Sequence, residues 1–210
     1  ESVTSENDIP GLNEARTAAH LNNQNIVAVY DFQVHGSMAY LIMEYVEGMT
    51  LTQFLKEYDD ELTLNLITAL FSDIARGVSF AHRHDVLHLD ITPDNILINH
   101  EGIAKVADFG LAKLGDCEQY GAATGGTIGY MPLEQMRQED LDGRCDEWSL
   151  ASILYEMLCG TNPFLAPDLP RAEAAIENAE LVLPSLCWDA LDEEADDVIF
   201  KALDPDRTRR

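Results

Sequence analysis

The run HLDITPDN at residues 88–95 stands a short strand, turn and strand ahead of the triplet DFG at residues 108–110. Together these runs carry two carboxylates and one carboxamide. Asp90 can accept the proton of an attacking hydroxyl, while Asn95 and Asp108 can supply the hard oxygen ligands that Mg²⁺ takes alongside phosphate and water. Neighbouring carboxylates repel each other by about 4 kcal/mol at about 4 Å and an effective dielectric of about 20, so such a cluster favours a cation. The pattern therefore predicts a site for a Mg²⁺-bound triphosphate.

The composition describes a strongly acidic chain with enough apolar residues for a core. Its 210 residues are 46% hydrophobic, and 13 basic against 38 acidic residues give a formal charge of −25. This length accommodates one large domain or two small lobes around a cleft. No apolar run reaches the roughly 18 residues of a membrane span, and the start of the chain lacks the pattern of a secretory signal. These features predict a soluble, cytoplasmic protein without a membrane segment.

The negative charge also bears on partners. It disfavours nucleic acid and anionic membranes, which bind clustered lysine and arginine, and it favours a basic protein substrate. An acidic surface that serves solubility alone explains the same composition. The four cysteines are far apart and form no Cys-x-x-Cys pair, which predicts reduced thiols rather than a zinc site or disulfides (Cys117, Cys145, Cys159 and Cys187).

Hydrophobic periodicity predicts an α+β fold in which a few strands precede a mainly helical part. The clearest helix has an apolar stripe at three- and four-residue steps from Leu66 to Ala81 and ends near 84–85. The other expected helices cover 13–21, 51–58, 146–158, 172–179 and 193–203, and the expected strands cover 26–32, 38–45, 96–98 and 103–106. Residues 108–134 have little periodicity and several glycines, which is typical of a functional loop.

Several further runs resemble the protein kinase superfamily, and among its members the bacterial serine/threonine protein kinases. The resemblance covers most of the chain and rests, beside 88–95 and 108–110, on NIVAVYD at 25–31, LIMEYVEG at 41–48, GTIGYMPLE at 126–134, DEWSLA at 146–151 and DPDRTR at 204–209. It implies a partial N-terminal lobe over 1–46, a helical C-terminal lobe over 47–210, and a signalling enzyme that transfers the γ-phosphate of ATP, with Mg²⁺ or Mn²⁺, to a protein hydroxyl.

The resemblance also implies residues that hold the nucleotide. Glu14 matches the helix glutamate that pairs with the family's phosphate-binding lysine. Met43 matches the gatekeeper, and the carbonyl of Glu44 and the amide of Val46 are expected to bond the adenine edge, above a floor formed by Leu97.

Other matched residues support the catalytic loop. Thr127 is expected to hydrogen-bond near Asp90, and Asp146 to hold the backbone of the catalytic loop, although an aspartate there is also a common helix N-cap. The arginine that pairs with Glu134 is expected to be Arg207 or Arg209, because the spacing differs by one from the family pattern.

The chain departs from the family at four places, one of which is Pro132-Leu133 in place of the usual Ala-Pro before Glu134. Leu89 replaces the usual arginine of the catalytic loop, which suggests activation without phosphorylation of the activation segment. Thr92 replaces a lysine near the transferred phosphate; its hydroxyl can still donate a hydrogen bond, but losing a preorganised charge there can cost about 10²–10³-fold in rate. No residue before Lys56 is a lysine and no glycine-rich phosphate loop is present. The sequence therefore suggests a truncated kinase domain that binds ATP weakly.

Two alternatives remain open from the sequence. Leu89, Thr92 and the absent lysine fit a pseudokinase that serves as a binding or scaffold module. A small-molecule phosphotransferase of the aminoglycoside or choline kinase type shares the His-x-Asp-x-x-x-x-Asn pattern, but residues 126–134 and 146–151 resemble the peptide-groove elements of protein kinases.

Overall fold

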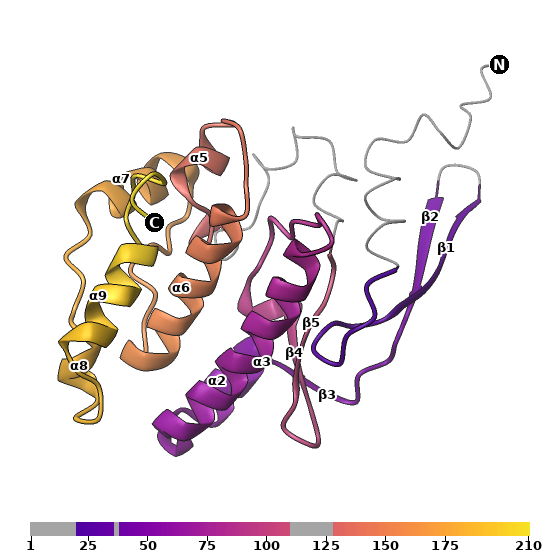
Figure 1. The fold of residues 1–210 in the computed structure, drawn as a ribbon, viewed down its shortest axis with the longest axis horizontal. Coiled ribbons are helices and arrows are strands. Elements are labelled where there is room, and N and C mark those ends of the chain that lie inside the picture. Colours follow the sequence, from indigo (N-terminus) through magenta and orange to yellow (C-terminus); the bar gives the residue numbers. More distant parts are fainter. Residues whose placement is uncertain (1–19, 36–37, 110–127) are drawn as a thin grey trace.

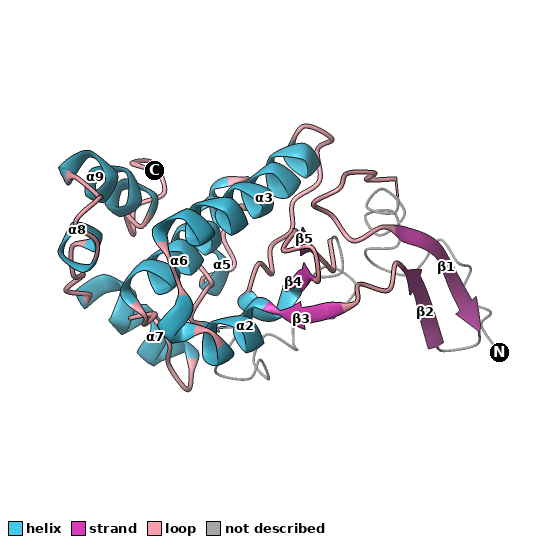
Figure 2. Ribbon diagram, turned by 90° about the horizontal axis from the view of Figure 1, so that it is seen from below, coloured by secondary structure: helices cyan, strands magenta, loops and turns pink. Residues whose placement is uncertain are grey.

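A computed structural model describes residues 20–35, 38–109 and 128–210, and it has the expected α+β fold, with two small sheets and several helices. Strands and helices occupy opposite ends of the molecule (Figures 1 and 2). The elements are β1 (Val29–His35), β2 (Met38–Met43), β3 (Gly48–Thr50), α2 (Leu51–Glu57), the 3₁₀ turn η2 (Asp59–Glu61), α3 (Leu64–His82), the 3₁₀ turn η3 (Pro93–Asn95), β4 (Ile96–Asn99), β5 (Ala104–Val106), α5 (Leu133–Met136), α6 (Arg144–Cys159), α7 (Leu169–Asn178), α8 (Pro184–Cys187) and α9 (Glu193–Ala202).

The first sheet is an antiparallel hairpin of β1 and β2, whose backbone register pairs residue 32 with residue 41. We expected the first strand to start at Ile26, but it starts at Val29. Ile26 instead forms an isolated parallel bridge with Val106, which also accepts a hydrogen bond from the Val27 amide at 2.9 Å. Pairing with β5 therefore draws residues 26–27 away from the hairpin.

The second sheet has the strand order β3-β4-β5, all antiparallel, and it lies between the hairpin and the helices (Figure 2). The predicted hairpin of β4 and β5 is confirmed. Its turn is closed by the Asn99 carboxamide, which accepts hydrogen bonds from the backbone amides of Glu101 and Ile103, and by Gly102 at a φ of +77°. A positive φ is easy only for glycine, which explains the residue at this turn.

The helical part is built around α3 and α6, which pack against each other. The predicted stripe of α3 is confirmed, with Leu70, Ile74 and Val78 fully buried. Thr63 caps this helix by accepting a hydrogen bond from the Leu66 amide at 3.2 Å. Helix α6 is also confirmed and carries Trp148 into the core. Each large apolar side chain that folding removes from water contributes about 1.5–3 kcal/mol to the stability of the folded state.

Close backbone packing joins α3 to the second sheet. A Cβ at Gly77 would lie 2.5 Å from the Asn25 carbonyl oxygen, so only glycine permits this approach. The Asn25 carboxamide donates a hydrogen bond to the Ala104 carbonyl at 3.0 Å, and its own carbonyl accepts one from the Val106 amide at 2.9 Å. The segment around Asn25 is therefore fixed between α3 and β5.

The remaining helices follow the sequence prediction with small shifts. The helix expected at 51–58 is α2, and Thr50 caps it in a reciprocal capping box with Gln53. Those expected at 172–179 and 193–203 are α7 and α9, whereas α5 and α8 were not predicted because four residues are too few for a periodic signal. The helix expected at 13–21 falls outside the described residues except for 20–21, which are not helical, and most of the 108–134 loop also lies outside them. Within the described ranges, no helix combines the length and apolar character that crossing a membrane requires.

Candidate active site

Asp146 anchors the backbone of the catalytic loop and is fully buried in the first turn of α6. Its carboxylate accepts hydrogen bonds from the His88 amide at 2.9 Å and the Leu89 amide at 2.8 Å, and it contacts the His82 imidazole at 2.7 Å. The expectation that Asp146 holds this loop is confirmed. The alternative that it caps the helix is wrong, because the N-cap is Gly143.

These contacts hold one residue of the loop, Leu89, in a strained backbone conformation. Leu89 has a φ of +63°, a region that costs a non-glycine residue free energy and persists only where the surroundings enforce it. The Asp146 carboxylate and the Gln135 carboxamide enforce it here, because Gln135 donates a hydrogen bond to the Leu89 carbonyl at 2.7 Å. The loop is thus preorganised by side chains from two distant elements.

His88 connects the loop to the end of β5. Its Nδ1 accepts a hydrogen bond from the Asp90 amide at 3.2 Å, so its Nε2 carries the proton and donates to the Ala107 carbonyl at 2.7 Å. The ring is fully buried and packs edge-on against Phe109, with centroids 4.6 Å apart. These contacts fix the position of Asp90 relative to the residues that follow β5.

Asp90 and Asn95 lie in direct contact at the two ends of the loop. The side-chain nitrogen of Asn95 donates hydrogen bonds to the backbone carbonyl of Asp90 at 2.8 Å and to the Asp90 carboxylate at 3.1 Å. Burial raises the pKa of the Asp90 carboxyl above its ordinary value, and the neighbouring Asp108 charge raises it further, while His88 and the Asn95 hydrogen bond act in the opposite direction. A carboxylate with a raised pKa is a stronger base than an exposed aspartate.

Asp108 lies two residues after the end of β5. The Ala107 amide donates to the Asn95 carbonyl at 2.8 Å, and Asp108 itself has a φ of +63°. Both side-chain amide hydrogens of Asn95 point to Asp90, and the Asp108 charge is near enough to Asp90 to raise the pKa of its carboxyl. The side-chain oxygens of Asn95 and Asp108 fit Mg²⁺, which binds through one or two protein ligands and completes its shell with phosphate and water. In the ranges that the structure describes, no group of three or more His, Cys, Asp or Glu residues is arranged to hold a metal.

Thr92 lies two residues beyond Asp90 and is buried. It occupies the N-cap position of η3, and its carbonyl accepts a hydrogen bond from the Asn95 amide at 3.0 Å. The residue that stands in the place of the family's lysine is therefore part of the turn that positions Asn95.

The hinge segment follows β2, at whose end Met43 is exposed. The Glu44 amide donates to the Ala28 carbonyl at 2.8 Å, and its carboxylate lies 2.9 Å from the Lys105 ammonium on β5. Burial opposes the charge of Glu44, but Lys105 and the Ala28 amide together hold the pKa of its carboxyl below the ordinary value. This ion pair ties the hinge to the strand that leads to Asp108. Sequence patterns gave no signal for it, because the partners are 61 residues apart.

The remaining nucleotide-site residues are placed as follows. Val46 is half-buried in the connection between β2 and β3. Leu97 is half-buried on β4, paired with Thr50 on one side and Lys105 on the other. Glu14 and Thr127 lie outside the described residues.

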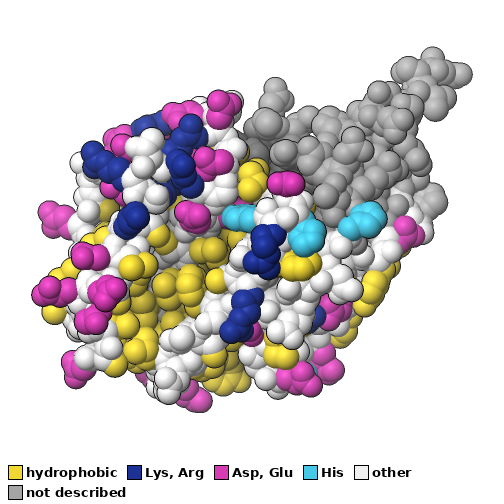
Figure 3. All heavy atoms as spheres, in the orientation of Figure 1, with side chains coloured by type: hydrophobic (Ala, Val, Ile, Leu, Met, Phe, Trp, Pro, Cys, Tyr) yellow, Lys and Arg dark blue, Asp and Glu magenta, His cyan; other side chains and the backbone are white. Residues whose placement is uncertain are grey.

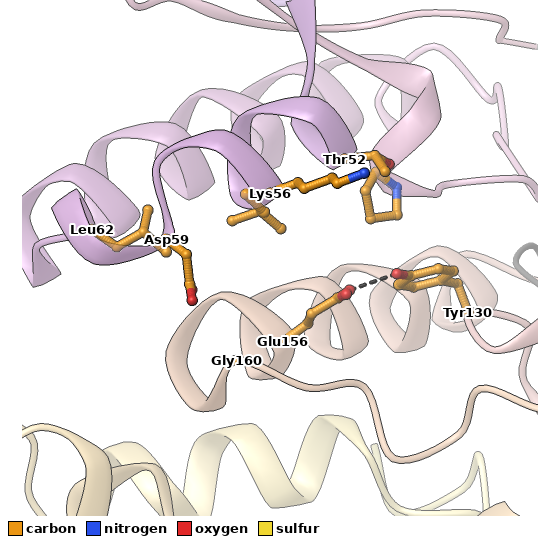
Figure 4. A pocket seen from close by; sticks show the side chains of 9 residues that line it. Thr52, Lys56, Asp59, Leu62, Tyr130, Glu156 and Gly160 are labelled. Carbon is orange, nitrogen blue, oxygen red and sulfur yellow. Dashed lines mark hydrogen bonds between the residues drawn. The ribbon is translucent and has the colours of Figure 1, made fainter.

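A pocket of about 410 Å³ opens between α2 and α6 beside the catalytic loop (Figure 4). On its lower wall the Tyr130 hydroxyl donates a 2.5 Å hydrogen bond to the Glu156 carboxylate, and Asp59 and Lys56 belong to the opposite wall. Burial raises the pKa of both Tyr130 and Glu156. Pro93, which lies three residues after Asp90 in the sequence, also lines the pocket. The pocket therefore borders the catalytic loop.

The end of the activation segment is anchored by an ion pair that we assigned to the wrong arginine. Arg210, rather than Arg207 or Arg209, makes a bidentate contact with the Glu134 carboxylate, at 2.6 and 3.1 Å. The Arg210 side chain is fully buried and its guanidinium lies 4.9 Å from the centroid of the Trp148 ring.

The turn that precedes Arg210 explains the error. Arg209 is 70% exposed and faces Asp204 and Asp206, while Arg207 donates to the backbone carbonyl of Asp140. The Asp206 carboxylate accepts hydrogen bonds from the Thr208 amide and hydroxyl, and the resulting turn leaves the next arginines free to reach different faces.

Comparison with known proteins agrees with this geometry. A protein kinase domain model matches residues 1–210, and the chain belongs to this family. Its relatives include the serine/threonine-protein kinase PknB of Mycolicibacterium smegmatis, 37% identical over 199 residues, and PknL of Mycobacterium tuberculosis, 35% identical over 209 residues. Each alignment covers 90% of this chain, but only 32% of PknB and 52% of PknL. The resemblance to bacterial serine/threonine kinases is confirmed, and the chain spans a third to a half of these relatives.

Proposed function

We propose that this protein transfers the γ-phosphoryl group of ATP to a serine or threonine hydroxyl of a protein. The observation that carries the proposal is the contact between Asp90 and Asn95 beside Asp108, on a loop anchored by Asp146. Phosphoryl transfer requires mainly positioning and charge neutralisation, and these three side chains match both needs. As ATP is the phosphoryl donor, we place the activity in the cytoplasm.

Each residue has a definite task in this mechanism. Asp90 orients the attacking hydroxyl and accepts its proton, with its raised pKa favouring the transfer. Asn95 and Asp108 hold Mg²⁺ or Mn²⁺, which neutralises charge on the phosphates when bound. Thr92 contributes by holding the turn that carries Asn95 and by presenting a hydroxyl in place of the family's lysine.

The adenine is proposed to lie against the hinge. Met43 borders it, the Glu44 carbonyl and the Val46 amide bond its edge, and Leu97 closes the floor. The Glu44–Lys105 ion pair supports this placement, because it fixes the hinge against β5. Glu14 is the proposed partner of the phosphate-binding lysine. This arrangement divides the chain into an N-terminal lobe over 1–46 and a C-terminal lobe over 47–210.

The test is transfer of label from γ-³²P-ATP by the full-length gene product, with Mg²⁺ and a basic protein as acceptor. We expect phosphoserine or phosphothreonine in the acceptor or in the kinase itself. Label in neither protein overturns the proposal and favours the pseudokinase. Label in choline or an aminoglycoside instead favours the small-molecule phosphotransferase.

The pseudokinase has one structural observation in its favour. Leu89 and Thr92, which replace the arginine and lysine of the family pattern, are both buried in the loop. Because neither side chain carries a charge, they offer no cation to the transferred phosphate or to a phosphorylated activation segment. The intact contact between Asp90 and Asn95 is the reason to prefer the enzyme.

We propose further that the protein substrate is basic. The chain has a formal charge of −25, and the pocket next to the catalytic loop is lined by two acidic residues, Glu156 and Asp59, and one basic residue, Lys56. A substrate arginine that enters this pocket would meet the half-buried Glu156 carboxylate, where a charge-assisted hydrogen bond is stronger than in water.

A substitution in this pocket tests the substrate proposal. We expect Glu156→Gln to raise the KM of an arginine-containing peptide about tenfold, which corresponds to about 1.4 kcal/mol, while leaving a peptide with glutamine in place of arginine unaffected. Steady-state kinetics with both peptides measure the difference. Glu147→Gln, on an exposed position of the same helix, is the matched control. An equal change for both peptides would contradict a basic subsite.

The raised pKa of Asp90 predicts a pH effect. We expect its carboxyl resonance, assigned by its loss in Asp90→Asn, to titrate above 3.8 in a ¹³C NMR experiment. The sign follows from burial, which penalises the charged form in the folded protein. The folded state therefore binds the proton more tightly than the unfolded state, and the stability that protonated Asp90 contributes is lost as pH rises through its folded pKa. Titration at or below 3.8 would contradict this environment.

A further inference from the structure

A polar groove of about 600 Å³ lies on α3, outside the site described above. One wall is a stripe of α3 residues and the other is the segment 23–25. We call it the α3 groove, and its lining residues are Asn23, Gln24, Asn25, Ser72, Ala75, Arg76, Ser79 and Arg83. Figure 3 shows Lys and Arg side chains along α3 and a second group of them over α5 and α7, while Asp and Glu side chains gather over α8 and α9.

The two arginines of the α3 groove are only weakly neutralised. Arg83 donates to the Ser79 hydroxyl at 3.0 Å and lies 6.0 Å from the Phe80 ring centroid, and both of these partners are uncharged. Arg76 is 64% exposed and pairs with Asp73 at 3.0 Å, but the second oxygen of Asp73 accepts a hydrogen bond from the Ala104 amide. On a chain with a formal charge of −25, this groove presents two guanidinium groups to solvent.

The spacing of the arginines restricts what fits. Seven residues of helix separate Arg76 from Arg83, which corresponds to about 10 Å along the axis and to two turns on one face. In an extended polyproline II segment, side chains three residues apart lie on one side and are separated by about 9 Å. The opposite wall offers the side chain of the exposed Gln24 and the side-chain amide of Asn23, whose oxygen accepts a hydrogen bond from the Asn25 backbone amide at 2.8 Å. These amides suit the backbone of a bound peptide.

We propose that the α3 groove docks an extended acidic segment of a partner protein, in which carboxylates three residues apart pair with Arg76 and Arg83. A guanidinium binds a carboxylate through two parallel hydrogen bonds, which gives both affinity and register. The formal net charge of −25 disfavours binding of the same segment to the surface as a whole, so the arginines set its position.

Two peptides of equal composition and different glutamate spacing test the register. The probe, called the spaced peptide, is a fluorescent dodecapeptide of four Glu-Pro-Gln repeats, and its control has the four glutamates at alternate positions, so that no two of them are three residues apart. Fluorescence anisotropy with the full-length protein should show that the spaced peptide binds about fivefold more tightly, because only it can engage both arginines. Equal binding of the two peptides, or no binding of either, overturns the proposal.

Substitutions test the residues. The double variant Arg76→Gln and Arg83→Gln should weaken the spaced peptide about tenfold, with unchanged circular dichroism and thermal midpoint. Arg171→Gln, which removes a 69% exposed arginine on α7, is the matched control and should leave binding unchanged. Asp90→Asn should bind the peptide as the parent does, which separates this docking site from the proposed catalysis.

Two outcomes count against the groove as a peptide site. Equal weakening by Arg171→Gln means that the peptide responds only to total charge. Concentration-dependent dimerisation that the double variant abolishes, without peptide binding by the parent, means that a second copy of the chain occupies the groove instead. Sedimentation velocity at several protein concentrations distinguishes this case.

Discussion

Asp90→Asn is expected to lower the rate of phosphoryl transfer by about 10²–10⁴-fold, the usual contribution of a positioned general base. The substitution keeps the shape of the side chain and leaves an oxygen to accept the hydrogen bond from Asn95, which the parent makes at 3.1 Å. It removes the negative charge and the ability to take a proton. Because burial raises the pKa of Asp90, the charged form costs folding free energy, and the variant should be at least as stable as the parent at neutral pH.

Single-turnover transfer from γ-³²P-ATP measures this effect without interference from product release. The matched control is Asp94→Asn, for which we expect no change. Asp94 is an exposed aspartate of the same loop and lies in the 3₁₀ turn η3. A rate within threefold of the parent for Asp90→Asn would remove Asp90 from the mechanism. A similar loss in Asp94→Asn would show that the total charge of the loop matters rather than the contact with Asn95.

The second large effect concerns stability. Arg210→Met is expected to lower the free energy of unfolding by about 3–5 kcal/mol, because it leaves the Glu134 carboxylate buried and without its ion pair. Glu134 is only 3% exposed, and in the parent both of its oxygens contact Arg210. The loss of the guanidinium from the Trp148 ring, 4.9 Å away, adds to the effect.

Urea unfolding followed by tryptophan fluorescence measures this change. Arg209→Met is the control, since that side chain is 70% exposed and surface substitutions usually change stability by less than about 0.5 kcal/mol. The double variant Glu134→Met and Arg210→Met should recover much of the loss, because no unpaired charge then remains in the core. Equal effects of Arg209→Met and Arg210→Met would contradict the assignment of the buried ion pair to Arg210.

Local signals in the sequence are sufficient to predict the catalytic loop and the main helices. The stripe of α3 is visible because Leu70, Ile74 and Val78 recur at helical spacing, and the turn of the β4–β5 hairpin is visible because Asn99 and Gly102 favour it. The role of Asp146 was accessible through the family resemblance, but its position within the first turn of α6 required the structure.

Contacts between distant parts of the chain could not be predicted. The Glu44–Lys105 ion pair joins the segment after β2 to β5, and the hydrogen bond from Tyr130 to Glu156 joins a loop to α6. Neither leaves a periodic trace in the sequence. The choice of Arg210 depends on the side-chain hydrogen bonds of a single turn, which spacing rules do not contain.

The central claim is that Asn95 and Asp108 hold one divalent cation against the terminal phosphates of a nucleotide that Asp90 serves. The most direct test replaces Mg²⁺ by paramagnetic Mn²⁺ in the presence of ATP and follows the side-chain NH₂ signals of asparagines by NMR. We predict that the Asn95 signal broadens beyond detection, while the signal of Asn178, at the end of α7, is unchanged. A sharp Asn95 signal in the nucleotide-saturated protein would contradict the account.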